Sequence, residues 1–208
     1  MGETLQPLVF IVSGPSGSGK STLVQRILEL PGTMPSVSCT TRPRRTTESS
    51  GKCYHFVSEA EFEQMAERGE FLEYARVFGK HNYGTPRRWL DEARQKRLDL
   101  VLEIDVQGAA QVKEKLPGAV ALFIVPPSRE ELERRLKDRG QDSEEEITRR
   151  LNRARDEILA FRKYYDYCVI NDDVERAGRE VQAIVTAVRC SSARNGARVA
   201  KLLESFGG

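Results

Sequence analysis

Residues 8–22 read LVFIVSGPSGSGKST, and this stretch decides the fold. An apolar run of strand length, Leu8 to Val12, leads directly into a loop made of glycine, serine and proline. The residues after the loop place three apolar side chains on one side of a helix, namely Leu23, Ile27 and Leu30. The stretch therefore predicts a buried strand, a tight loop and an amphipathic helix in direct succession.

The loop matches G-x-x-x-x-G-K-[ST], a pattern that binds phosphate when it lies between a strand and a helix. Its members are Gly14, Pro15, Ser16, Gly17, Ser18, Gly19, Lys20 and Ser21. Small residues let backbone amides approach phosphate oxygens, Lys20 neutralises β- and γ-phosphate charge, and the Ser21 hydroxyl is suited to Mg²⁺. The alternative is a glycine-rich turn without a ligand, which requires a chance match of about one in a hundred. The loop therefore predicts nucleotide binding.

Further along the chain, short apolar runs alternate with longer amphipathic stretches. Four runs outside the first read as buried strands, at residues 37–41, 98–104, 119–125 and 167–170. Runs of this kind separated by helices are typical of parallel strands with crossover connections. We expect an α/β fold with a five-stranded parallel sheet, of the P-loop NTPase type, flanked by helices.

The pattern changes between about residues 42 and 88, where short alternating pieces indicate a small inserted mixed α/β lobe. Three capping boxes predict helix starts, with Ser58 and Glu61, Ser128 and Glu131, and Ser143 and Glu146 as the paired residues. Apolar residues at helical spacing predict one long helix: Ile147, Leu151, Ala154, Ile158 and Phe161. Only the segment after Cys190 lacks a readable role.

Composition sets outer limits on function. The chain has 208 residues, a formal net charge of +2, 39% hydrophobic and 31% charged residues, which excludes disordered and collagen-like classes. No apolar run reaches the length of a membrane helix, and the start shows no export or lipid-anchor signal. The four cysteines form no C-x-x-C pair. We expect a cytoplasmic protein that binds neither membranes nor nucleic acid.

Several motifs together resemble the guanylate kinase family, in order from about residue 8 to residue 188. The motifs that carry the resemblance are residues 36–42 (SVSCTTR), 71–74 (FLEY), 83–85 (YGT), 102–108 (LEIDVQG), 126–128 (PPS), 139–140 (RG) and 169–173 (VINDD). One short loop found by chance would not bring these motifs with it. The resemblance implies transfer of a phosphoryl group from ATP to GMP, which serves guanine nucleotide synthesis and recycling, with dGMP as a further acceptor.

The resemblance also implies how the chain is divided. It suggests one domain over residues 1–208, with a core at about 5–41 and 89–190 and a GMP-binding lobe at about 42–88. A helical lid would cover about residues 135–155, and residues 191–208 would form a C-terminal tail. Whether the chain is a monomer or a homo-oligomer stays open.

For the acceptor, the resemblance assigns Arg42, Arg45, Tyr54 and Tyr83 to the phosphate of GMP and Ser38, Glu73 and Thr85 to guanine, with Glu103 and Asp105 also at the GMP site. The chemistry agrees, because two guanidinium groups suit a dianion. A carboxylate at Glu73 accepts hydrogen bonds from N1 and the exocyclic amine of guanine. Adenine has an acceptor at N1, which allows discrimination of about 10⁴-fold.

For the donor, the resemblance places ATP on the loop at residues 14–21 and adds Arg135, Arg139 and Asn171. The cofactor is Mg²⁺, held by Ser21, with Asp105 as a second candidate ligand. The residues that would act on the moving phosphoryl group are Lys20, Arg42, Arg139, Arg150 and Asp105. Arg134, Arg149 and Arg153 stay unassigned.

Each assignment has a structural alternative. Glu73 fits an outward position in a strand, and residues 42–45 fit a solvated basic loop. Thr85 followed by Pro86 also reads as a helix cap with proline at the first helical position. Glu103 and Asp105 fit capping carboxylates before a helix, and the arginines after residue 134 fit a solvated helix face.

Rival functions are separated by specific features. A non-catalytic scaffold of the same fold that binds phosphorylated proteins would typically lack an intact phosphate loop, whereas Lys20 and Ser21 are present. A kinase for another acceptor would not need the set formed by Ser38, Glu73 and Thr85. A GTPase would need a base-reading N-K-x-D motif, which the sequence lacks.

Overall fold

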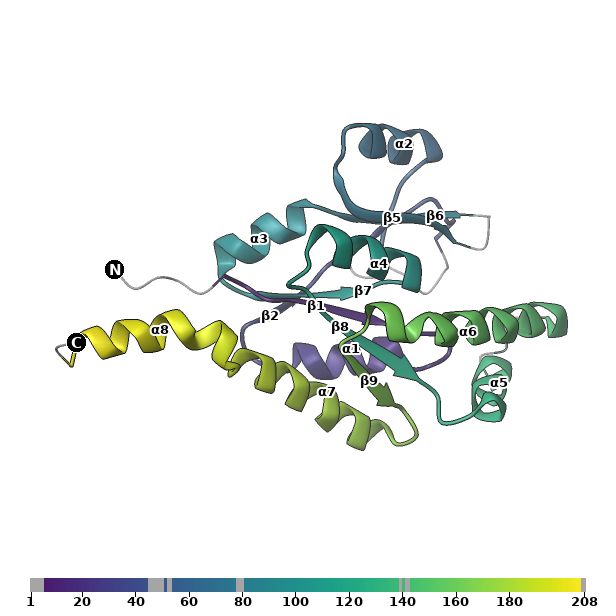
Figure 1. Cartoon of the computed structure of the whole chain (residues 1–208). Coiled ribbons are helices and arrows are strands. Elements are labelled where there is room, and N and C mark those ends of the chain that lie inside the picture. The colour runs from purple at the N-terminus through teal and green to yellow at the C-terminus, as the bar shows by residue number, and fades with distance from the viewer. Residues whose placement is uncertain are drawn as a thin grey trace.

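The central sheet has five parallel strands (Figure 1). The computed structural model describes residues 6–44, 51, 54–77, 81–138, 140 and 143–206, with the backbone only at 77, 160 and 162. The strand order is β2-β7-β1-β8-β9, and every neighbouring pair is parallel. The strands are β1 Val9–Ser13, β2 Thr33–Pro35, β7 Asp99–Glu103, β8 Val120–Val125 and β9 Tyr167–Ile170. Four of the five predicted strands are confirmed.

Helices cover both faces of this sheet (Figure 1). On one face, α1 Lys20–Leu28 and α7 Val174–Arg189 pack against the sheet, and on the other lie α3 Arg88–Lys96 and α4 Val106–Lys115. Successive side chains of a strand point to opposite faces. Phe10 and Val12 therefore join the cluster under α1 and α7, whereas Ile11 joins the cluster under α3 and α4. Strands buried on both faces explain the unbroken apolar runs of the sequence.

A second, four-stranded sheet forms the inserted lobe, with the order β4-β3-β6-β5. Its strands are β3 Cys39–Thr40, β4 His55–Phe56, β5 Phe71–Val77 and β6 His81–Pro86, with α2 Glu59–Glu67 beside them (Figure 1). The prediction that residues 37–41 form the fifth core strand is wrong. Cys39 pairs with His55 and Gly84 in the lobe, and Thr33–Pro35 takes the edge of the core sheet beside β7.

The three helix starts predicted from capping boxes are confirmed, including that of α5 Arg129–Asp138 after Ser128. Ser58 and Glu61 form a complete capping box at α2, and Ser143 caps α6 Glu144–Tyr164 through the amide of Glu146. The alternative reading of Thr85 and Pro86 as a helix cap is wrong, because both residues still belong to β6 and α3 begins at Arg88. The Thr85 hydroxyl is instead committed to a carboxylate.

The helix pair α5 Arg129–Asp138 and α6 packs as a separate layer beside the core. Leu132 and Leu136 of α5 meet Ile147, Leu151 and Ala154 of α6 in their own small cluster. The predicted apolar stripe of α6 thus holds at these positions and again at Phe161, which stacks on Phe123, whereas Ile158 is 42% exposed.

The last helix, α8 Ser192–Glu204, extends away from the body of the protein (Figure 1). Within the described ranges, no helix is both long enough and apolar enough to cross a membrane.

One buried carboxylate ties three parts of the core together and yields a stability prediction. Asp99 opens β7; its Oδ1 accepts from the Leu8 amide at 2.7 Å and its Oδ2 from Arg189 Nε, at the end of α7, at 2.8 Å. The Asp99 side chain is 8% exposed.

We expect Asp99→Ala to lower the free energy of unfolding by about 3 kcal/mol, because it leaves a buried amide and a guanidinium without their acceptor. Urea unfolding of both proteins measures this, with exposed Asp91→Ala, which breaks a surface pair with Arg94, as the control. Equal losses in the two variants would contradict the role given to Asp99.

Candidate functional site

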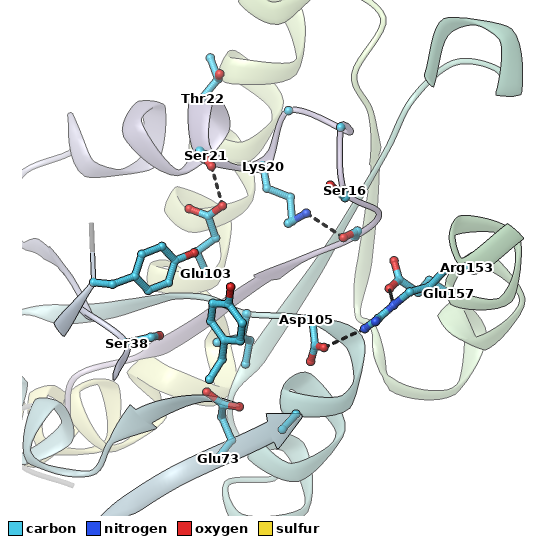
Figure 2. A pocket seen from close by; sticks show the side chains of 17 residues that line it. Ser16, Lys20, Ser21, Thr22, Ser38, Glu73, Glu103, Asp105, Arg153 and Glu157 are labelled. Carbon is cyan, nitrogen blue, oxygen red and sulfur yellow. Dashed lines mark hydrogen bonds and ion pairs between the residues drawn. The ribbon is translucent and has the colours of Figure 1, made fainter. Parts of the chain in front are cut away.

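A cavity of about 330 Å³ opens between the central sheet and the inserted lobe. It lies at the carboxyl ends of β1 and β7, where open α/β sheets bind ligands. Figure 2 shows Lys20 and Ser21 on one side of this cavity and Ser38 and Glu73 on the other. The cavity thus brings the predicted phosphate loop and the predicted base-reading residues together.

The backbone of the phosphate loop requires its glycines. Gly14 has φ of 142°, and a Cβ there would lie 2.1 Å from the carbonyl oxygen of Ile124. Gly19, with φ of 90°, precedes α1 and contributes no capping side chain. The first amides of α1 are therefore placed to bind an anion, aided by the positive end of the helix.

Lys20 folds back over this loop. Its Nζ donates to the carbonyl oxygens of Gly14 at 2.8 Å and Pro15 at 2.9 Å (Figure 2). The ammonium group thus already lies over the concave side of the loop, where a phosphate chain would sit.

Ser21 lies beside a carboxylate that the family resemblance assigns to the GMP site. Its Oγ donates to Glu103 Oε1 at 2.6 Å (Figure 2). The contact arises because β1 and β7 are neighbours with Val12 opposite Glu103, so the loop and the end of β7 emerge side by side. Glu103 therefore contacts the phosphate-loop side of the cavity, and its predicted place at the GMP site stays a prediction.

Glu73 is a buried acid on the opposite wall, with 4% of its surface exposed. One of its oxygens accepts from the Thr85 hydroxyl at 2.6 Å, and the hydroxyls of Thr85 and Ser38 lie 3.2 Å apart. A Cβ on Gly108 would lie 2.5 Å from Glu73 Oε2, so only glycine leaves room for this acid beside α4. The three predicted base-reading residues thus form one hydrogen-bonded row.

The surroundings of Glu73 change its acidity. Burial raises the pKa of the Glu73 carboxyl to about 7. The Thr85 hydrogen bond acts in the opposite direction, and the charge of Asp105 adds to the upward shift. A carboxyl held near neutrality in a cavity is a typical feature of functional sites.

Arg42 stands at the mouth of the lobe among aromatic rings. Its Nε donates to Tyr83 Oη at 3.2 Å, and its guanidinium lies 5.6 Å from the ring centre of Tyr54. The Tyr54 and Tyr83 rings meet edge to face at 5.7 Å. Three of the four predicted phosphate-gripping residues are therefore together, while Arg45 lies outside the described residues.

Two arginines of the predicted lid and Asn171 make hydrogen bonds to the phosphate loop or to each other. Arg150 Nη1 donates to Ser16 Oγ at 2.9 Å, and Arg135 Nη2 donates to the carbonyl of Asn171 at 2.8 Å. Asn171 Nδ2 in turn donates to the carbonyl of Ser18 at 2.8 Å. These three residues contact the loop or its neighbours without lining the described cavity, and Arg139 lies outside the described residues.

Asp105 has two roles, one of which is the capping alternative. Its Oδ1 accepts from the Gly108 amide at 2.9 Å as the N-cap of α4, and its Oδ2 accepts from Arg153 Nη2 at 3.1 Å. Arg153 Nε also donates to Glu157 Oε1 at 2.8 Å, and both residues line the cavity. Arg153 has no predicted role from the sequence, and Glu157 is not among the predicted site residues. Their spacing of four on a helix predicts an ion pair, but nothing local shows that the pair faces the cavity.

Comparisons with known proteins agree with this geometry. The family model described as guanylate kinase matches residues 6–188. The chain is 48% identical over 202 residues to the guanylate kinase of Myxococcus xanthus, covering 97% of this chain and 95% of the relative. It is 46% identical over 201 residues to that of Vibrio parahaemolyticus, covering 95% and 96%.

A solved structure extends the likeness to three dimensions. The crystal structure of guanylate kinase from Anaplasma phagocytophilum superposes with a TM-score of 0.77 at 35% identity, covering 98% of this chain and 96% of that one. Sequence and fold therefore agree over nearly the whole length, and the chain belongs to the guanylate kinase family.

Proposed function

We propose that the cavity holds ATP and GMP at the same time and that the γ-phosphoryl group passes between them, giving ADP and GDP. This is the reaction of the guanylate kinase family, of which the chain is an enzyme member. The observation that carries the proposal is the hydrogen-bonded row of Glu73, Thr85 and Ser38, of which Glu73 and Ser38 line one cavity together with an intact phosphate loop.

On the acceptor side, Glu73 accepts from N1 and the exocyclic amine of guanine, while Thr85 and Ser38 complete the polar wall. Glu73 and Thr85 are buried, so a base that leaves the Glu73 carboxylate unpaired meets the full desolvation cost. Arg42 and Arg45 hold the phosphate of GMP, with the hydroxyls of Tyr54 and Tyr83 beside them. Because the roles assigned to this set concern the base and the phosphate of GMP, dGMP is also expected to be accepted.

On the donor side, the loop at residues 14–21 and the start of α1 bind the phosphates of ATP, and Lys20 moves from its carbonyl partners to phosphate oxygens. Ser21 and Glu103 offer a hydroxyl and a carboxylate within 2.6 Å, a donor set that suits Mg²⁺. Bound there, Mg²⁺ supplies charge neutralisation at the phosphates. Asp105 fits this role less well than Glu103, because both of its oxygens already accept hydrogen bonds.

Transfer itself needs alignment, positive charge and exclusion of water more than a strong base. Arg150 and Arg135 hold the loop in shape, and Arg139 is assigned by family resemblance to the moving phosphoryl group. We assign the core to about residues 5–38 and 89–190, the GMP lobe to about 39–88, because β3 belongs to the lobe sheet, and the lid to about 135–155 of a single cytoplasmic domain. The tail at 191–208 is given no part in the reaction.

The test is ADP release from Mg-ATP in the presence of GMP, dGMP, AMP, UMP or CMP. We expect turnover with GMP to exceed turnover with AMP by at least about 100-fold in kcat/KM, since a site built on polar pairing discriminates strongly. ATP binding without turnover for any nucleoside monophosphate would refute the proposal.

A further inference from the structure

Four charged side chains meet on the floor of the cavity. Lys20 and Arg153 are positive, Asp105 and Glu157 are negative, and all four line the same space (Figure 2). Arg153 is the link among them, because it donates to Asp105 at 3.1 Å and to Glu157 at 2.8 Å. It comes from α6, whereas Asp105 comes from the start of α4, so the link joins the lid helix to the core.

These groups are partly removed from water. The side chains of Asp105, Arg153 and Glu157 are 23%, 24% and 14% exposed. At such sites charges interact more strongly than in bulk solvent. Two carboxylates on the floor of a cavity that must hold several phosphate groups would therefore repel those groups unless a cation offsets them.

Asp105 and Glu157 differ in the number of positive groups and hydrogen-bond donors that offset their negative charge. Asp105 also receives the Gly108 amide and the positive end of α4. Glu157 depends on Arg153, and Lys20 lies near enough for its charge to lower the pKa of Glu157, which burial raises. Without Arg153, Glu157 would therefore compete with phosphate for Lys20.

We propose that Arg153 is a positioning residue that neutralises Glu157 and Asp105, so that Lys20 and the cavity remain available to the phosphates of the substrates. The proposal rests on the function proposed above. It assigns to Arg153 a role distinct from that of Arg150, which contacts the phosphate loop directly.

The test is a double-mutant cycle of Arg153→Gln and Glu157→Gln, with kcat and KM for both substrates and calorimetric dissociation constants for GMP and ATP. Arg155→Gln is the matched control, since Arg155 is an exposed arginine of the same helix. Arg153→Lys keeps the charge, and circular dichroism with thermal unfolding checks the fold of every variant.

We expect Arg153→Gln to lower kcat/KM by about 30-fold, the size of one uncompensated charge at cavity distances. In the Glu157→Gln background the same change should cost only about threefold, because the charge that needed an offset is gone. Arg153→Lys should retain most of the activity, and Arg155→Gln should match wild type.

Equal losses in both backgrounds would show that Arg153 only tethers α6 to α4, and would overturn the proposal, as would wild-type kinetics in Arg153→Gln. Absence of GMP phosphorylation by wild type is a separate failure, of the proposed function. The calorimetric cycle on ATP binding then still decides the role of Arg153.

Discussion

Lys20→Ala is expected to lower kcat for GMP phosphorylation by about 10³-fold while leaving the fold intact, because it removes a preorganised positive charge from the site where phosphate charge moves. Lys20 Nζ contacts the carbonyls of Gly14 and Pro15, so the ammonium lies over the loop before any substrate arrives. A steady-state assay with Mg-ATP and GMP measures the loss.

The control for this change is Lys96→Ala, which removes a lysine from a surface pair with Glu92. That variant should keep wild-type kinetics. ATP binding by Lys20→Ala should weaken much less than kcat falls, since the backbone amides of the loop still hold the phosphates. If Lys20→Ala kept a tenth or more of wild-type kcat, the assignment of Lys20 to the moving phosphoryl group would be wrong.

The parts of the fold that the sequence predicted well are those determined by local pattern. The run from Val9 to Ser13, the glycine loop and α1 follow one another, so periodicity and one motif were enough. The box of Ser58 and Glu61 satisfies helix amides within four residues, and it was predicted correctly.

The errors arose where distant segments decide the structure. Cys39 and Thr40 have a strand sequence, but their partners are His55 and Phe56 on one side and Tyr83 and Gly84 on the other. No local property tells whether such a strand joins the core or the lobe. In the same way, local sequence leaves the cap open as an alternative for Thr85 before Pro86, and only the distant Glu73 of β5, which accepts from the Thr85 hydroxyl, excludes it.

For the candidate site, too, family resemblance named some residues, whereas the contacts of others depend on how distant segments pack. Family resemblance named Glu73, Thr85 and Ser38. The structure brings these residues into one row, in which the Thr85 hydroxyl lies within hydrogen-bond distance of the other two. Glu103 was placed at GMP, and the pairing of β1 with β7 brings it to Ser21. Helix α6 turns Arg153 and Glu157 into the cavity, and only the packing of α6 against the core reveals this.

Glu73→Gln is expected to lower kcat/KM for GMP by about 10³-fold, because the amide presents an N–H where guanine needs an acceptor and the mismatch is buried. The loss for AMP should be much smaller, so selectivity for GMP should collapse. Assays with both acceptors measure the change, and exposed Glu70→Gln, from the adjacent turn, should leave both activities unchanged.

The raised pKa of Glu73 gives the same variant a second readout. Since burial raises the pKa of this carboxyl from 4.5 to about 7, wild-type affinity for GMP should fall as the pH drops below 7 and the acceptor becomes protonated. The part of that pH dependence that comes from Glu73 should vanish in Glu73→Gln, because an amide does not titrate in this range, whereas the part that comes from the GMP phosphate should remain.

The contribution of Glu73 to the free energy of unfolding should depend on pH in the opposite sense to the affinity for GMP. A carboxyl whose pKa is higher in the folded state favours folding most at low pH, and this contribution is lost as the pH rises through about 7. Relative to wild type, Glu73→Gln should therefore gain up to about 3 kcal/mol of unfolding free energy between pH 4.5 and pH 8. Urea unfolding at both pH values tests this: a gap that did not widen would mean that Glu73 is not held as a buried acid. If Glu73→Gln is more stable at pH 8 but has lower affinity for GMP, the buried charge of Glu73 destabilises the fold and is needed to recognise guanine.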